Sequence, residues 1–190
     1  MRVDAQRNRA RILEAARALV AETGVDATME DIARHAGVAV GTLYRHFPAK
    51  EDLVAAVVED SLAQMASLTE GALAAVHAGA PPGVSLGELF REVAERYASD
   101  RAFKSAAGHL DVDVDSEIEA AAPGTAIARS ALAISELLRR AQLAGEVRAD
   151  LTLADLAVLL AAVPGAEVPR DSRARFVDIV IAGLAPALHP

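Results

Sequence analysis

The sequence predicts an all-α fold divided into a small N-terminal unit and a larger C-terminal unit. Apolar residues recur at spacings of three and four along most of the chain, which is the period of an amphipathic helix. No segment alternates as a strand does, and the breaks between the periodic stretches are rich in Gly, Pro or Asp. Because 190 residues can bury a sizeable core, we expect two helical domains, over residues 1–49 and 50–190.

Three helices are predicted in the first fifty residues. The first spans 6–23 and ends at Gly24, since Gly readily takes the left-handed conformation at a helix end. Thr28 caps the second helix, which Gly37 stops after about two turns. A third short helix follows over 40–47. Two short helices around a Gly turn form a helix-turn-helix.

The rest of the chain is also predicted to be helical. A long helix runs from Lys50 to about His77, and the Gly- and Pro-rich stretch 78–85 is predicted to be a loop. Further helices are expected over about 85–99, 102–110, 125–144, 151–163 and 171–186.

Composition excludes several classes of protein. Without Cys there is no disulfide framework, thiolate metal site or thiol nucleophile. The longest apolar stretches, such as 153–166, carry a charge or a Pro and fall short of a bilayer span. Glu14 and Arg17 interrupt what would be the apolar region of a signal peptide. We therefore expect a cytoplasmic protein with no membrane partner.

The predicted helix 40–47 has one face for the core and one for a partner. In a helix-turn-helix the second helix lies in the major groove of DNA. Leu43 and Phe47, four residues apart, are expected to face inward. This leaves Val40, Gly41, Tyr44 and part of Arg45 facing outward. Arg45 is the best candidate for reading a base, because a guanidinium can bind guanine through two hydrogen bonds.

Four residues in and after this helix carry donors suited to phosphate oxygens. They are Thr42, Tyr44 and His46, and Lys50 at the start of the next helix, where the helix dipole also favours an anion. Three of them have a plainer alternative: Tyr44 as a packing residue, His46 as an ordinary surface histidine and Lys50 as a solvated charge.

Charge is distributed unevenly along the chain. Residues 1–50 hold eight Lys/Arg against six Asp/Glu, a balance of +2, whereas residues 51–190 hold eleven against twenty-one, a balance of −10. The asymmetry suggests one end that approaches DNA. It also argues against a sequence-independent, architectural DNA binder, which would need basic charge along its length.

The N-terminal motifs resemble those of a known family. The runs NRxRILEAA, AETG, TMEDIAxxAGV and GTLYRHFPxKEDL cover residues 8–53 and look like the DNA-binding domain of TetR-family transcriptional repressors. The resemblance implies that Thr42, Tyr44, His46 and Lys50 contact the DNA backbone and that Thr28 touches a phosphate. It implies that Val40, Gly41 and Arg45 face the bases, with further contacts from a flexible arm containing Arg2, Arg7, Arg9 and Arg11.

The resemblance also implies that the C-terminal domain is helical, binds a small molecule and forms a homodimer on a palindromic DNA operator. In this family the last two helices of each chain pair into a four-helix bundle. Two apolar faces are candidates for that interface: Leu156, Leu159, Leu160, Val163, Phe176, Val177, Val180 and Leu184. Some of these residues are equally well explained as core, since periodicity does not separate core from interface.

A pocket for the effector is expected between the long helix and the helices at 85–110 and 125–144. The candidates are large or adaptable side chains, some able to make one polar contact: Met65, Leu68, Phe90, Tyr97, Phe103, His109 and Leu137. Each of them taken alone is also explained as ordinary core, and His109 as an exposed residue at a helix end.

No motif supports catalysis or a bound metal. The acidic stretch 111–119 imitates the start of a calcium loop, but Ser116 stands where Gly is needed and Ala122 where a bidentate Glu belongs. We expect no cofactor and no enzymatic activity. An all-helical enzyme or small-molecule carrier with a vestigial helix-turn-helix remains the alternative to a regulator.

Overall fold

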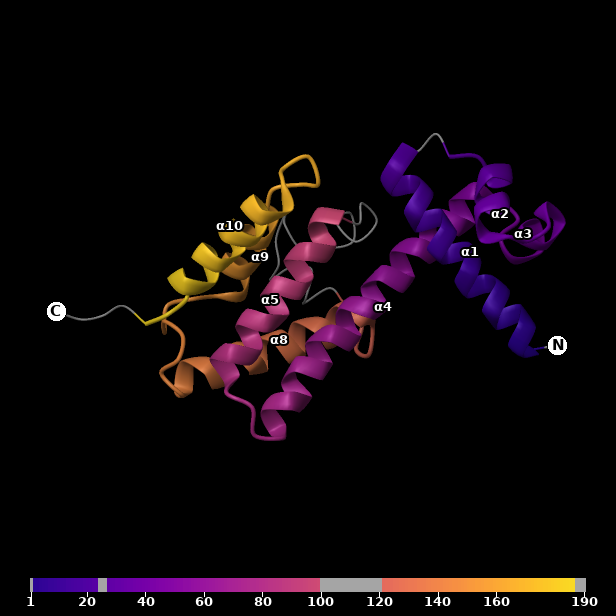
Figure 1. Cartoon of the computed structure of the whole chain (residues 1–190). Helices are drawn as coiled ribbons and strands as arrows, with labels where there is room; N and C mark the ends of the chain where they lie inside the picture. The colour runs from indigo at the N-terminus through magenta and orange to yellow at the C-terminus, as the bar shows by residue number, and fades with distance from the viewer. Residues whose placement is uncertain (1, 24–26, 100–120, 187–190) are drawn as a thin grey trace. The chain divides into compact units, whose positions relative to one another are not determined.

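The computed structural model describes residues 2–23, 27–99 and 121–186, and in these ranges the chain forms helices and no strand (Figure 1). The chain divides into two units, one ending at Ser61 and the other beginning at Leu62, both within one long helix. The helices of the described ranges are α1 (Arg2–Thr23), α2 (Met29–Ala36), α3 (Val40–His46), α4 (Lys50–His77), α5 (Pro82–Ser99), α8 (Ala126–Leu143), α9 (Leu153–Ala161) and α10 (Arg170–Gly183).

Helix α2 has a defined cap at each end. The Thr28 hydroxyl accepts a hydrogen bond of 3.1 Å from the Asp31 amide, as the predicted N-cap requires. At the other end Gly37 takes a φ of +62°, and its N–H bonds back to the last turn. This left-handed residue ends α2 and turns the chain toward α3.

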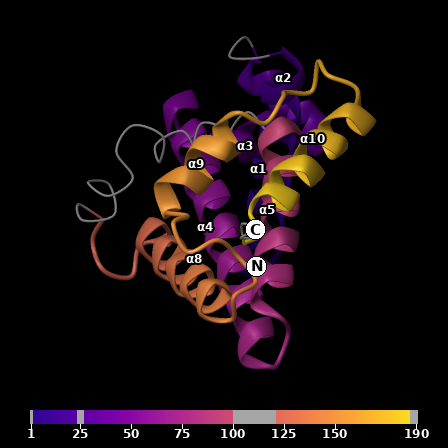
Figure 2. The same cartoon turned by 90° about the vertical axis from the view of Figure 1, so that its left-hand side faces the viewer.

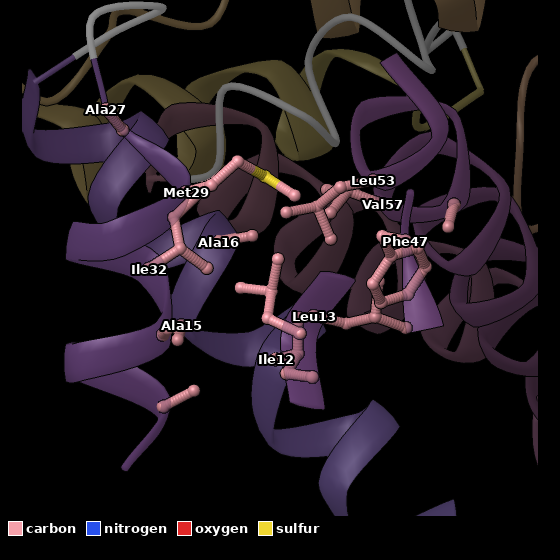
Figure 3. Close-up of a cluster of buried hydrophobic side chains, with 14 residues drawn as sticks. Ile12, Leu13, Ala15, Ala16, Ala27, Met29, Ile32, Phe47, Leu53 and Val57 are labelled. Atoms are coloured by element: carbon pink, nitrogen blue, oxygen red, sulfur yellow. The ribbon is translucent and has the colours of Figure 1, made fainter. Parts of the chain in front are cut away.

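The first unit is built around one cluster of apolar side chains (Figure 3). Helix α1 contributes Ile12 and Leu13, α2 contributes Ile32, and α4 contributes Leu53 and Val57. The full cluster consists of Ile12, Leu13, Ala15, Ala16, Ala27, Met29, Ile32, Ala33, Ala36, Leu43, Phe47, Leu53, Ala56 and Val57. Because its members come from four helices, the cluster fixes the orientation of α3 relative to α1 and α2.

The second unit is organised around α5, which packs against α8, α9 and α10. Figure 2 shows α9 and α10 in front of α5. Helices α5 and α10 run antiparallel, with Arg91 and Asp178 paired at 2.8 Å and Glu95 and Arg170 paired at 3.3 Å. The apolar face of α5 is buried, including Leu86, Leu89, Phe90, Val93, Ala94 and Tyr97.

The turn between α8 and α9 is held by one amide. Nε2 of Gln142 lies 3.3, 3.2 and 2.8 Å from the carbonyl oxygens of Arg148, Ala149 and Leu151. Helix α9 then starts with a capping box, in which Thr152 and Asp155 satisfy each other's backbone amides. This segment is therefore a structured turn between two helices.

Two observed helix starts differ from the predicted ones. Helix α1 begins at Arg2 instead of residue 6. Arg2, Arg7, Arg9 and Arg11, which the family resemblance assigns to a flexible arm, all lie on this helix. Helix α5 begins at Pro82, inside the predicted loop 78–85, because Pro is well suited to the first position of a helix. The helix expected over 102–110 lies outside the described residues. Within the described ranges, no helix is long and apolar enough to cross a membrane.

Candidate nucleic-acid interface

Helix α3 presents an open surface above two buried anchors. Leu43 is fully buried and Phe47 is 4% exposed, as their spacing predicts. On the opposite side Val40 and Tyr44 are 38% and 42% exposed. Nothing lies within 4 Å of where a β-carbon on Gly41 would stand. The outward side of α3 is thus free of steric obstruction while its inward side is fixed in the core.

Arg45 is exposed and oriented by its own helix. Its Nε donates a hydrogen bond of 3.1 Å to the carbonyl oxygen of Gly41, one turn earlier. The described residues offer its terminal amino groups no further hydrogen bond. Because the two groups of a guanidinium can bind one guanine edge together, this geometry suits the base-reading role predicted for Arg45.

The predicted phosphate contacts on α3 differ in exposure. Tyr44 is exposed and its hydroxyl makes no hydrogen bond within the described residues. Thr42 and His46 are half-buried, and the imidazole of His46 lies against the ring of Phe47 with centroids 6.3 Å apart. Of the three, Tyr44 has the donor most available to an oxygen outside the protein.

Thr28 is already engaged as a helix cap. Besides accepting from the Asp31 amide, its hydroxyl donates to the Asp31 carboxylate at 2.6 Å. That hydroxyl and the neighbouring Arg34 hold the pKa of Asp31 below its usual value. A phosphate contact from Thr28 would therefore exchange the bond to a charged carboxylate for a bond to a charged phosphate.

Lys50 is half-buried at the start of α4, next in sequence to the acidic Glu51 and Asp52. The Asp52 carboxylate accepts a hydrogen bond of 3.0 Å from the amide of Ala49 and so caps α4. Glu51 is exposed in the same turn. These carboxylates offset part of the attraction that the helix dipole and Lys50 exert on an anion.

Two of the N-terminal arginines brace the helix-turn-helix from α1. The guanidinium of Arg9 lies 5.7 Å from the centre of the Phe47 ring, within the range of a cation–π contact. Arg11 donates a hydrogen bond of 3.1 Å to the carbonyl oxygen of Gly37. The family resemblance implied that both residues belong to a flexible arm, whereas the structure places them on α1.

The predicted effector residues that the structure describes belong to the second unit. Met65, Phe90, Tyr97 and Leu137 are buried, and Leu68 is half-buried. Phe103 and His109 lie outside the described residues. The expected pocket between α4, α5 and α8 therefore stays a prediction.

The residues predicted for the dimer interface fall into two groups. Leu156, Val163, Val177 and Leu184 are buried within the single chain. Leu159, Leu160, Phe176 and Val180 are half-buried. The large apolar residues most exposed on the same two helices are Val158 and Ile179, at 66% and 64%. Sequence reasoning passed over both, although they lie on the same helices as the residues it selected.

The described residues contain no group of three or more His, Asp or Glu side chains that could hold a metal ion. The side chains exposed on α3 offer hydrogen bonding, charge and apolar contact. These are the interactions through which proteins position themselves on DNA and read its bases.

Two family models match the chain. The model described as "Bacterial regulatory proteins, tetR family" matches residues 12–57, and the model described as "Transcriptional regulator SbtR-like, C-terminal domain" matches residues 81–186. The second match covers more than half of the chain.

Solved structures agree with both matches. A TetR transcription regulatory protein from Mycobacterium vanbaalenii is 38% identical, with 97% of this chain and 98% of that chain covered and a TM-score of 0.69. A TetR transcriptional regulator from Streptomyces coelicolor is 31% identical, with 94% and 99% covered and a TM-score of 0.66. A gamma-butyrolactone receptor is 25% identical, with 95% and 97% covered and a TM-score of 0.59.

The curated relatives match a shorter region. An HTH-type transcriptional regulator of Staphylococcus aureus (strain USA300) is 48% identical over 63 residues, which make up 33% of this chain. The match spans 34% of the length of that regulator.

Proposed function

This chain belongs to the tetR family of bacterial regulatory proteins, and from that premise we propose that it is a dimeric repressor released from a palindromic operator by a small-molecule effector. The observation that carries the proposal is the outward surface of α3. Val40, Gly41, Tyr44 and Arg45 are exposed on one side of a helix that Leu43 and Phe47 hold in the core. Such a helix can enter the major groove without rearranging its support.

We assign two kinds of contact to this surface. Arg45 reads a base, and Val40 and Gly41 allow close approach of the helix to the groove floor. Thr28, Thr42, Tyr44, His46 and Lys50 position the protein on phosphates. Few contacts therefore specify the DNA sequence, and the phosphate contacts contribute affinity for DNA of any sequence.

For dimerisation, we place the interface on the outward sides of α9 and α10. Both helices pack on α5 through buried residues such as Leu156 and Val177, which leaves Val158 and Ile179 exposed. Burying these apolar side chains in a second copy is favourable. A two-fold dimer places two recognition helices about one DNA turn apart, roughly 34–36 Å, and so requires a palindromic operator.

We place the effector among α4, α5 and α8, where Met65, Leu68, Phe90, Tyr97 and Leu137 lie. The gamma-butyrolactone receptor at 25% identity supports small-molecule control of this fold. To release the operator, an effector has to favour the conformation that does not bind DNA, by a coupling on the order of 1–3 kcal/mol. The protein would act in the cytoplasm, where the chromosomal operator is located.

The test is binding of the purified protein to the DNA upstream of its own gene, measured by fluorescence anisotropy against a scrambled duplex across a salt series. We expect a preference for the native duplex that persists as salt rises, because base contacts depend on salt less than phosphate contacts do. Equal, steeply salt-sensitive binding would move the search to a selection of operators from the whole genome. Failure of that selection as well would overturn the proposal.

A further inference from the structure

A groove of about 430 Å³ lies in the second unit, away from the predicted effector residues. Its walls are the start of α5, the turn between α8 and α9 and the end of α10. The apolar part includes Val84, Val147, Ile181 and Leu184. This volume falls within the range of about 300–1,000 Å³ that is usual for small-molecule sites.

Three links between the walls hold the groove open. A carboxylate oxygen of Glu146 accepts a hydrogen bond of 2.6 Å from the Gly83 amide and joins the turn to α5. The Arg148 amide donates a hydrogen bond of 2.9 Å to the carbonyl oxygen of Leu184 and so joins the turn to the end of α10. The pair of Arg91 and Asp178 joins α5 to α10. With all three walls connected, the groove exists before any ligand arrives.

Gly83 shows how closely the turn and α5 approach each other. A β-carbon at this residue would lie 2.7 Å from Cβ of Glu146. Only Gly permits this approach, which brings the Glu146 carboxylate to the edge of the groove. The Glu146 carboxylate is held there by the hydrogen bond from the Gly83 amide.

The charges around the groove are predominantly negative. Arg91 is the one cation in its lining, and Asp178 already neutralises it. Glu88 makes no ion pair within the described residues, and Glu146 has only an amide as its partner. The groove thus offers apolar walls and an excess of negative charge.

We propose that this groove binds a small lipophilic cation, such as an aryl or alkyl ammonium compound. The apolar body of the cation packs on Val84, Ile181 and Leu184. Its charge lies beside Glu88, with the field of Glu146 adding to the attraction. The inference goes beyond the proposed function, since the groove contains none of the proposed effector residues and its ligand binding requires no DNA.

The experiment is isothermal titration of the full-length, DNA-free protein with benzyltrimethylammonium, benzyl alcohol and phenylacetate. These probes share an aromatic ring and differ in charge. We expect the cation to bind best and the anion worst. Methyl NMR spectra should show the cation shifting the signals of Val84, Ile181 and Leu184.

Two matched variants separate the groove from general surface charge. Glu88→Gln should weaken binding of the cation by up to about fivefold, the upper end for one exposed charge. Glu92→Gln removes the same charge one turn further along α5, outside the lining, and should leave affinity unchanged.

Several results would overturn the inference. One is the absence of binding heat and of methyl shifts at millimolar concentrations of the cation. Others are equal affinities for the cation and the anion, or equal effects of the two variants on the affinity for the cation. The last is a set of methyl shifts confined to residues outside the groove. Because no DNA is present, none of them bears on operator binding, and a failed operator test leaves this result intact.

Discussion

The guanidinium of Arg11 donates a hydrogen bond of 3.1 Å to the carbonyl oxygen of Gly37, the residue that ends α2. Gly37 has a φ of +62°, and a β-carbon there would lie 2.5 Å from the same guanidinium. One residue therefore both closes α2 and fixes it to α1. The left-handed backbone at this position favours a residue without a β-carbon.

Replacing Gly37 with Ala should destabilise the first unit. The left-handed conformation alone costs about 1–2 kcal/mol for a residue with a β-carbon. A β-carbon would also displace the Arg11 guanidinium and so weaken its hydrogen bond to Gly37. Urea denaturation followed by circular dichroism measures the change. Gly41→Ala is the matched control, because Gly41 is helical and has open space around it. We expect it to raise stability by up to about 1 kcal/mol.

Replacing Arg45 with Ala should lower operator affinity without unfolding the protein. A base-reading arginine contributes about 1–3 kcal/mol and its loss relaxes specificity at one base pair. Because Arg45 is exposed, the midpoint of thermal unfolding should stay within a few degrees of the wild type. Anisotropy with the operator and with single-base variants measures both effects. Equal loss of affinity for the operator and a scrambled duplex would contradict the base-reading role.

Replacing Lys50 with Gln should weaken DNA binding without changing the sequence preference, unlike the replacement of Arg45. A phosphate contact weakens binding to all sequences alike, and the slope of log K against log salt falls by about 1. The salt series measures that slope for operator and scrambled DNA. A change in sequence preference with an unchanged slope would show that Lys50 does not contact a phosphate.

Much of the first unit follows from local chemistry. Thr28 and Gly37 define both ends of α2 because capping and the left-handed turn are local properties. The spacing of Leu43 and Phe47 identifies the buried side of α3 for the same reason. The start of α1 at Arg2 was missed, because a polar and basic sequence carries little apolar periodicity. Its stabilisation by Arg9 and Arg11 involves residues distant in sequence.

The second unit was less predictable from the sequence. Leu156 and Val158 are two residues apart on α9 and similar in character, yet one is buried and the other is 66% exposed. Arg173 is buried, although Arg is usually exposed. Its guanidinium donates a hydrogen bond of 2.8 Å to the carbonyl oxygen of Val168. Both outcomes depend on which neighbour covers each face, which is a property of the tertiary fold.

Replacing Val158 or Ile179 with Glu should dissociate the dimer, since each substitution places a charge on an apolar face that a second copy would cover. Sedimentation velocity measures the shift from dimer to monomer, and circular dichroism verifies that the chain stays folded. Leu132→Glu is the matched control, because Leu132 is 70% exposed but lies on α8, outside the proposed interface. Dissociation by Leu132→Glu alone would relocate the interface to α8.

The lowered pKa of Glu136 predicts how the stability of the fold depends on pH. Hydrogen bonds from Arg139 and then Arg140 lower its pKa from 4.5 to about 2. Since the folded pKa lies below the ordinary value, this carboxylate contributes stability above about pH 4.5 and loses that contribution as the pH falls toward 2.

Thermal unfolding at a series of pH values tests this sign. Glu136→Gln should lower the unfolding temperature at neutral pH, and the difference from the wild type should shrink between pH 4.5 and about 2. Added salt should reduce the difference at neutral pH, because the guanidinium groups are partly exposed and screened. Glu59→Gln serves as the control, since Glu59 is exposed and makes no ion pair within the described residues. A difference between Glu136→Gln and the wild type that stays constant down to pH 2 would show that the loss comes from packing and not from charge.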